Sequence, residues 1–171
     1  MEPRDLLTDA FTRIQELYAE VAADLTAELL RHRPREGDGP AGNSIGWLLW
    51  HLARVQDDHL ADLAGTDQAW HDGWSARFGL PLAPDDTGYG HTSDQVDRVA
   101  IEDAALLAGY HAEVHGRTIA YLARVDADEL DRVVDRRWDP PVTAGVRLVS
   151  VEGDCLQHLG QAAYLRGLHR G

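Results

Sequence analysis

Apolar residues recur every three or four positions along four long segments of the chain, and this spacing constrains its fold more than any other feature. In the first segment, residues 3–32, the repeated apolar positions are Leu7, Phe11, Ile14, Tyr18, Val21 and Leu25. Such spacing places these side chains on one face of an α-helix. The same period predicts further helices from Asn43 or Ser44 to Gly65, over residues 92–124 and over residues 144–168.

Glycine and proline interrupt the pattern between the predicted helices. Residues 33–42 hold two prolines and three glycines, and residues 66–91 hold six more glycines and prolines beside four aromatic residues. A long loop of this kind is typical of a packed cover or of a pocket wall. Residues 126–145 are irregular apart from a short extended piece at Val133 and Val134. These features predict an all-α protein, with residues 1–171 forming a single domain, a four-helix bundle with long connecting loops.

Charge and composition exclude several classes of partner. The formal net charge of −13 repels the phosphates of nucleic acids, so we expect no nucleic-acid partner. No apolar run approaches the ~20 residues of a membrane-spanning helix, and the charged N-terminus has no signal segment, so we expect a cytoplasmic protein without a membrane partner. The single cysteine, Cys155, cannot form an internal disulfide. The sequence contains no lysine, which excludes Schiff-base catalysis.

Three polar residues of the predicted second and fourth helices form a candidate metal site. Asp154 and His158 are four residues apart and lie on the apolar side of the last helix. His51 lies among apolar residues of the second helix. Polar groups on inward faces are costly unless they pair or bind an ion. Facing helices of a bundle commonly hold metals, and two imidazoles with one carboxylate leave a coordination position open for water.

Each of these residues also has a purely structural interpretation. Asp154 and His158 fit an ordinary ion pair, and His51 fits a hydrogen-bonded core histidine. His111 and His115 form a second pair with the spacing of metal ligands. The apolar stripe of their helix passes to one side of both residues, so their imidazoles are expected on its flank.

Two further residues lie within two helical turns of the candidate ligands. Asp58 follows His51 by seven residues and is a candidate acceptor that orients a ligand imidazole, with a solvated acid as the alternative. Gln161 lies one turn after His158 and has the same two interpretations. We interpret Cys155 as a small buried side chain and not as a nucleophile.

Three segments of the chain resemble the DinB-like superfamily. Residues 43–59, which include His51, resemble the second helix of that superfamily, and residues 90–96 resemble the start of its third. Residues 154–167, with a His-x-Gly-Gln motif that begins at His158, resemble its last helix. The resemblance covers most of the chain in the right order. It implies a four-helix bundle, often a homodimer, that holds a divalent metal.

The resemblance also implies which residues bind the metal. In the superfamily, one histidine comes from the second helix and two histidines, four residues apart, come from the last. His51 and His158 match two of these positions, and Asp154 stands at the third. A carboxylate there favours metals that accept oxygen ligands, so zinc, nickel, iron and manganese are all candidates. The resemblance gives no support to His111 and His115.

Several members of the superfamily are thiol transferases or isomerases that use a low-molecular-weight thiol. The chain is most similar to the mycothiol S-transferase branch, which implies a metal-dependent transferase that conjugates mycothiol to small electrophiles in detoxification. A bound cation can deprotonate a coordinated thiol at neutral pH. Two alternatives stand beside this one. The first is another metal-dependent enzyme, a hydrolase or isomerase, that uses the same site. The second is a non-enzymatic, dimeric stress-response or binding protein with a vestigial site.

Overall fold

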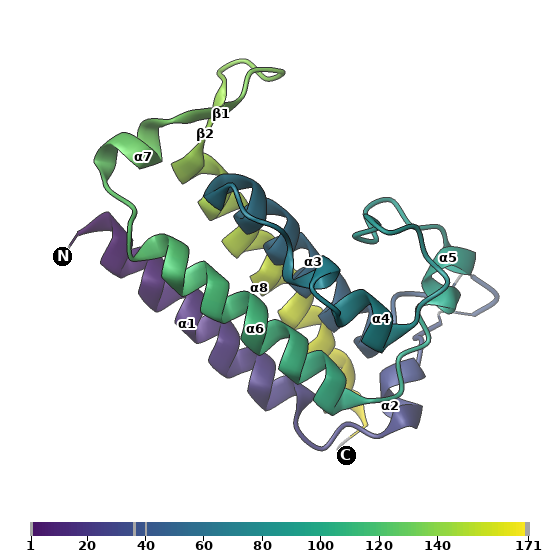
Figure 1. Ribbon diagram of the computed structural model, residues 1–171. Helices are drawn as coiled ribbons and strands as arrows, with labels where there is room; N and C mark the ends of the chain where they lie inside the picture. Colours follow the sequence, from purple (N-terminus) through teal and green to yellow (C-terminus); the bar gives the residue numbers. More distant parts are fainter. Residues whose placement is uncertain (1, 36, 40, 170–171) are drawn as a thin grey trace.

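Four long helices form the bundle. The computed structural model describes residues 2–35, 37–39 and 41–169, so two positions of the predicted loop at 33–42 and both ends of the predicted domain lie outside the described residues. The long helices are α1 (Pro3–Ala22), α3 (Ile45–Ala64), α6 (Ala104–Leu122) and α8 (Ala144–Leu168). α3 packs on α8 and α6, and α1 packs on α6 and α8 (Figure 1). The all-α prediction is confirmed.

The first predicted helix, residues 3–32, is two helices. α1 ends before residue 23, and α2 (Ala27–Arg31) follows it. Asp24 between them has φ +60, which takes the backbone out of the right-handed helix. Thr26 then caps α2 by accepting a hydrogen bond from a backbone N–H of that helix. Leu25 is buried in spite of the break, so the apolar period continues where the helix does not.

The third predicted helix, residues 92–124, is also divided. The Thr-x-x-Gln capping box is present and begins α5 (Ser93–Arg98). The chain then leaves the helix over residues 99–103, and the Asp103 side chain caps α6. Val99 and Ile101 in this gap are buried, and Val99 continues the helical spacing of Val96 although it lies outside the helix. The prediction that the last helix begins at residue 144 is confirmed, and Thr143 caps it.

The two long connections carry short elements of their own. The segment over residues 66–91 contains the 3-10 helix η1 (Ala69–His71) and α4 (Trp74–Phe78). Trp70 is buried there, and the neighbouring Trp74 and Phe78 pack against the core, so this part of the loop covers the bundle. Figure 1 shows the second connection projecting from the opposite end of the bundle.

That second connection ends in an antiparallel hairpin. It runs through α7 (Ala127–Asp131), β1 (Val133–Asp135) and β2 (Val142–Thr143). The extended piece predicted at Val133 and Val134 is confirmed by β1. The hairpin leads directly into the first turn of α8, so it stands beside the face of that helix on which Asp154 lies.

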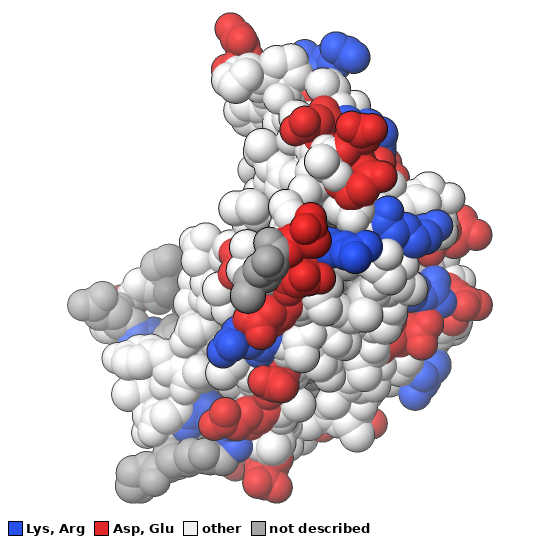
Figure 2. Space-filling view, turned by 90° about the vertical axis from the view of Figure 1, so that its left-hand side faces the viewer, with Lys and Arg blue, Asp and Glu red and all other residues white. Residues whose placement is uncertain are grey.

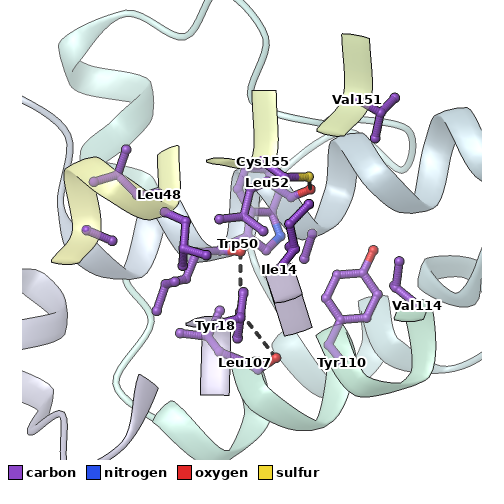
Figure 3. Close-up of a cluster of buried hydrophobic side chains, with 14 of the residues drawn as sticks. Ile14, Tyr18, Leu48, Trp50, Leu52, Leu107, Tyr110, Val114, Val151 and Cys155 are labelled. Atoms are coloured by element: carbon purple, nitrogen blue, oxygen red, sulfur yellow. Dashed lines mark hydrogen bonds between the residues drawn. The ribbon is translucent and has the colours of Figure 1, made fainter. Parts of the chain in front are cut away.

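The core lies between the four long helices. The Tyr18 hydroxyl of α1 lies 3.3 Å from the carbonyl oxygens of both Leu49 and Leu107, which ties α1 to α3 and α6 (Figure 3). Leu48, Leu52 and other apolar side chains of α3 fill the space toward α8. None of the helices in the described part of the chain is both long enough and apolar enough to cross a bilayer.

Candidate metal centre

His51 lies on α3 and is almost completely buried. Its Nδ1 is 2.5 Å from the carbonyl oxygen of Thr87. Because a carbonyl only accepts hydrogen bonds, the imidazole donates from Nδ1 and keeps a lone pair on Nε2. The Trp47 ring stacks on the imidazole with 4.5 Å between ring centroids. His51 is therefore held in one orientation, with Nε2 available to a metal.

Asp154 and His158 lie one turn apart on α8, as their spacing predicts. The His158 ring centroid is 4.7 Å from that of His51, and His158 Nε2 is 3.5 Å from Asp154 Oδ1. The second carboxylate oxygen, Asp154 Oδ2, is buried without a hydrogen-bond partner. A buried carboxylate oxygen in this state is costly unless a cation or a donor satisfies it.

The three side chains fit a divalent metal. The ligand atoms of His51, Asp154 and His158 all lie within 4.8 Å of one another. Two atoms bound to one ion at about 2.1 Å are separated by at most about 4.2 Å, so side-chain shifts of roughly half an ångström complete the site. Two imidazoles and one carboxylate suit zinc, nickel, iron or manganese and leave further coordination positions open.

The charge states of His51 and Asp154 suit a cation, whereas His158 must release its proton to bind one. Burial lowers the pKa of His51, and the hydrogen bond to Thr87 offsets part of this effect. The hydrogen bond to Asp154 raises the pKa of His158. Burial opposes the ionisation of Asp154, but its hydrogen bond with His158 and the nearby imidazoles outweigh burial and lower the pKa of the carboxyl. The site thus presents an ionised carboxylate to a metal.

The two predicted orienting residues have different placements. Gln161 Oε1 lies 3.4 Å from His158 Nδ1, which leaves His158 Nε2 directed toward Asp154. Asp58 is engaged elsewhere, because its Oδ1 accepts a hydrogen bond from Gln68 Nε2 at 2.7 Å. The acceptor at His51 Nδ1 is therefore the Thr87 carbonyl and not Asp58.

His111 is separate from this site. Its Nδ1 lies 2.6 Å from Gln15 Oε1, its Nε2 lies 3.3 Å from Gln56 Oε1, and Tyr18 stacks on the ring. His115, one turn further along α6, is not among the residues that cluster around His51. Within the described part of the chain, His51, Asp154 and His158 form the one cluster with metal-ligand geometry.

The segment before α5 builds one wall of the site, and sequence reasoning did not identify its role. Asp86 accepts a hydrogen bond from the backbone N–H of Gly88 at 2.7 Å. Its carboxylate oxygens also lie 3.0 and 3.1 Å from His91 Nε2. The other ring nitrogen of His91 accepts from Trp47 Nε1 at 3.2 Å. Asp86 and His91 thus attach this segment to the ring that stacks on His51.

Gly88 allows this wall to approach the ligand closely. Its φ is +87, which favours glycine, and a Cβ at this position would lie 3.0 Å from His51 Nδ1 and 2.9 Å from the Trp50 ring. The preceding residue, Thr87, provides the carbonyl that orients His51. The sequence signal was a glycine-rich loop. A backbone carbonyl carries no residue-type signature, so its role cannot be identified from the sequence.

A cavity of about 570 Å³ opens beside the candidate ligands. It extends from His51 and Asp154 along α8 to the hairpin, where Arg137, Trp138 and Arg147 line it. Small-molecule sites commonly have volumes of roughly 300–1,000 Å³. The cavity can therefore hold a small molecule with one end against the metal ligands.

Two polar residues of this cavity were also not identified from the sequence. Arg147 Nη1 donates to His59 Nδ1 at 2.9 Å. Burial, and then the charge of Arg147, lower the pKa of His59. These residues are 88 positions apart and meet only because α3 and α8 run in opposite directions past each other.

Cys155 faces away from the cavity. Its Sγ lies 3.8 Å from the carbonyl oxygen of Leu52, and the side chain is completely buried (Figure 3). Burial raises the pKa of the Cys155 thiol well above its usual range. Both observations agree with a small core residue and not with a nucleophile.

Charged groups are interspersed on the surface. On the face shown in Figure 2, arginines lie among aspartates and glutamates, and no broad basic area is present. This distribution agrees with the net charge of −13.

Comparisons with known proteins bear on both fold and site. The sequence profile of the DinB superfamily matches residues 10–162. A structure described as the crystal structure of the conserved protein of locus from Enterococcus faecalis is similar to this chain, with a TM-score of 0.87. The two sequences are 32% identical, and the match covers 97% of this chain and 96% of that chain. No curated protein matches the chain significantly.

Proposed function

The chain belongs to the DinB superfamily, and from this membership and the geometry of its candidate metal centre we propose that it is a metal-dependent thiol S-transferase. We propose mycothiol as the thiol and a small electrophile as the second substrate, in a reaction that serves detoxification. One observation carries the proposal: His51, Asp154 and His158 converge, and the first two line one end of a cavity large enough for a small molecule.

The chemistry follows from the donor set. His51, Asp154 and His158 would hold the divalent cation, which when bound would favour the thiolate form of a coordinated thiol at neutral pH. Thr87 and Gln161 fix the two imidazole rings, while Trp47 and Trp50 exclude water from one side of the site. In the transfer, the sulfur forms a bond to the electrophilic carbon. The leaving group departs with its bonding electron pair, and the thiol proton passes to solvent.

Elemental analysis tests the metal site. We expect about one divalent ion per chain in the wild type and less than about a tenth of that in His51→Ala, Asp154→Ala and His158→Ala, because each change removes one of three ligands. Glu152→Ala and His169→Ala remove the same types of side chain elsewhere on or beside α8 and should retain the metal. Retention of metal in all three site variants would contradict the assignment.

Turnover distinguishes the functions that share such a site. Conjugation of mycothiol to 1-chloro-2,4-dinitrobenzene, lost in His158→Ala, would support the transferase. Product formation without any thiol would favour a metal-dependent hydrolase or isomerase. Bound metal without turnover in either assay, or absence of metal after incubation with zinc, nickel, manganese and iron(II), would favour a binding protein.

We further propose that the protein is a homodimer. The support is a row of exposed apolar side chains along α8, at Val149, Leu156 and Tyr164. Solvated apolar rows of this kind are typical of contact surfaces between proteins. Sedimentation equilibrium should give twice the chain mass, and Leu156→Asp should give the monomer. A monomeric wild type would refute the dimer without affecting the metal site.

A further inference from the structure

The end of the cavity away from the metal ligands contains an arginine that shares its nearest carboxylate with a second arginine. Arg147 lies seven residues before Asp154 on α8, so the two positions are about 10 Å apart along the helix axis. Its Nη1 donates to the His59 ring, while its Nη2 is 3.6 Å from Asp135 Oδ2, beyond hydrogen-bond distance. The Arg147 side chain is 20% exposed and lines the cavity.

The nearest carboxylate is already paired. Asp135 accepts from Arg137 Nη2 at 2.7 Å, from Arg137 Nε at 3.0 Å and from the Arg137 backbone N–H at 2.9 Å. Arg137 and Arg147 thus share Asp135 at the hairpin end, while the other two carboxylates that line the cavity belong to Asp58 and Asp154. Arg147 therefore keeps donors for an anion that the protein does not supply.

Two exposed aromatic rings line the cavity. Trp138 on the hairpin is 66% exposed, and Tyr89 in the segment before α5 is 91% exposed. Aromatic side chains usually bury their rings, so two solvated rings beside a cavity indicate a contact surface for a ligand. Trp138 lies on the hairpin and Tyr89 follows the glycine that borders His51, so a flat group between the two ends of the cavity can contact both rings.

We propose that the hairpin end of the cavity is a subsite for a carboxylate group of the substrate, which Arg147 binds while the reactive end of the same molecule lies at the metal ligands. The reaction in this inference rests on the proposed thiol transfer, but the carboxylate binding does not. The distance between the two ends selects a molecule about 10 Å long. Trp138 and Tyr89 favour an aromatic or other planar middle part.

Binding of a simple aromatic acid tests the subsite without turnover. The probe is biphenyl-4-carboxylate, with biphenyl-4-carboxamide as its neutral counterpart, in equilibrium dialysis with metal-loaded and metal-free protein. Arg147→Gln keeps a donor for His59 but removes the charge, and it should weaken carboxylate binding roughly ten- to hundredfold. Carboxamide binding should change less than about twofold, and Arg147→Lys should recover part of the carboxylate affinity.

Two controls make the test decisive. Arg98→Gln removes the same charge from α5, away from the cavity, and should leave both affinities unchanged. The melting temperature and metal content of Arg147→Gln should match the wild type. Equal carboxylate affinity in Arg147→Gln and wild type would overturn the proposal. So would carboxylate binding that disappears in metal-free protein, because the probe would then bind the metal.

Turnover shows which substrate carries the carboxylate. With mycothiol, Arg147→Gln should lower kcat/KM for 4-chloro-3,5-dinitrobenzoate about tenfold or more and leave the value for 1-chloro-2,4-dinitrobenzene unchanged. A rise in the KM of the thiol with both electrophiles would place the carboxylate on the thiol instead. Absence of turnover with normal probe binding would refute the transferase and leave the subsite in place.

Discussion

Two histidine clusters in the same bundle differ in what they leave unsatisfied. The His111 ring is completely buried, with a glutamine side chain at each nitrogen and Tyr18 stacked on its face. The cluster of His51, Asp154 and His158 leaves a buried carboxylate oxygen without a partner and borders a cavity. By spacing alone, the His-x-x-x-His pair on α6 is the better match to a metal pair. His115 Nδ1 is also buried without a partner, but His115 belongs to no cluster of three ligand residues in the described part of the chain. An unpartnered buried carboxylate beside a cavity therefore indicates a metal site better than residue spacing does.

Removing the His111 side chain should have the largest effect on the free energy of unfolding. His111→Ala removes the side-chain partner of Gln15 and one partner of Gln56, and it opens a cavity beside Tyr18. We expect a loss of about 3 kcal/mol in the free energy of unfolding, measured by urea denaturation, with the metal content unchanged. Loss of the metal in this variant would show that the two clusters are not independent.

Metal binding to His51, Asp154 and His158 should stabilise the native protein. At a free metal concentration one hundred times Kd, the native protein should gain about 2.7 kcal/mol, because the unfolded chain does not hold the three ligands together. Asp154→Ala should gain almost nothing under the same conditions. Thermal unfolding with added metal and with chelator measures both values. An equal gain in both proteins would place the metal elsewhere.

Lowering the pH should destabilise the protein through the buried His111 ring. Burial lowers the pKa of His111 to about 3, from 6.5 in an exposed residue. Below pH 6.5 the unfolded chain takes up a proton on His111 that the folded chain does not. The contribution of the neutral His111 ring to the free energy of unfolding is therefore complete above pH 6.5 and falls as the pH decreases toward 3. The loss between pH 7 and pH 5 is about 2 kcal/mol. Urea denaturation at both values should show this loss in wild type but not in His111→Gln, and equal losses would contradict it.

A pair of glycines provides the smallest and most specific comparison. Gly88→Ala and Gly90→Ala both place an alanine at positive φ, but only a Cβ at 88 meets the site, 3.0 Å from His51 Nδ1. Both changes should cost about 1 kcal/mol in backbone strain. Gly88→Ala should in addition weaken metal affinity roughly tenfold, because it displaces the carbonyl that orients His51. Isothermal titration calorimetry measures the zinc affinity of both variants. Equal affinities of Gly88→Ala and Gly90→Ala would show that the segment at Gly88 does not orient His51.

The sequence predicts the long helices well where packing and capping agree. α8 begins at the predicted residue 144, with Thr143 as its cap, and Ser44, one of the two predicted caps, caps α3. The breaks after α1 and before α6 could not be predicted from the apolar period, because Leu25 and the apolar residues at 99–103 stay buried outside any helix. The hydrophobic core extends beyond the helix ends, so a residue can be buried without being part of a helix.

The candidate ligands were predictable because side chains have a chemical identity. His51, Asp154 and His158 are the residue types that metals bind, and helical spacing places two of them on one face. Their surroundings were not predictable. The Thr87 carbonyl has no sequence signature, and Arg147 meets His59 only through the packing of distant helices.

The stacking of Trp47 on His51 gives the site its own optical reporter. The two ring centroids are 4.5 Å apart, so the indole lies next to any ion that the imidazole holds. An ion with a partly filled d shell, such as iron(II) or nickel(II), quenches the emission of an adjacent indole, whereas zinc, with a filled shell, does not. The difference in fluorescence between the wild type and Trp47→Phe therefore gives the emission of Trp47 alone. Its change on titration distinguishes zinc from the other candidate metals without any label.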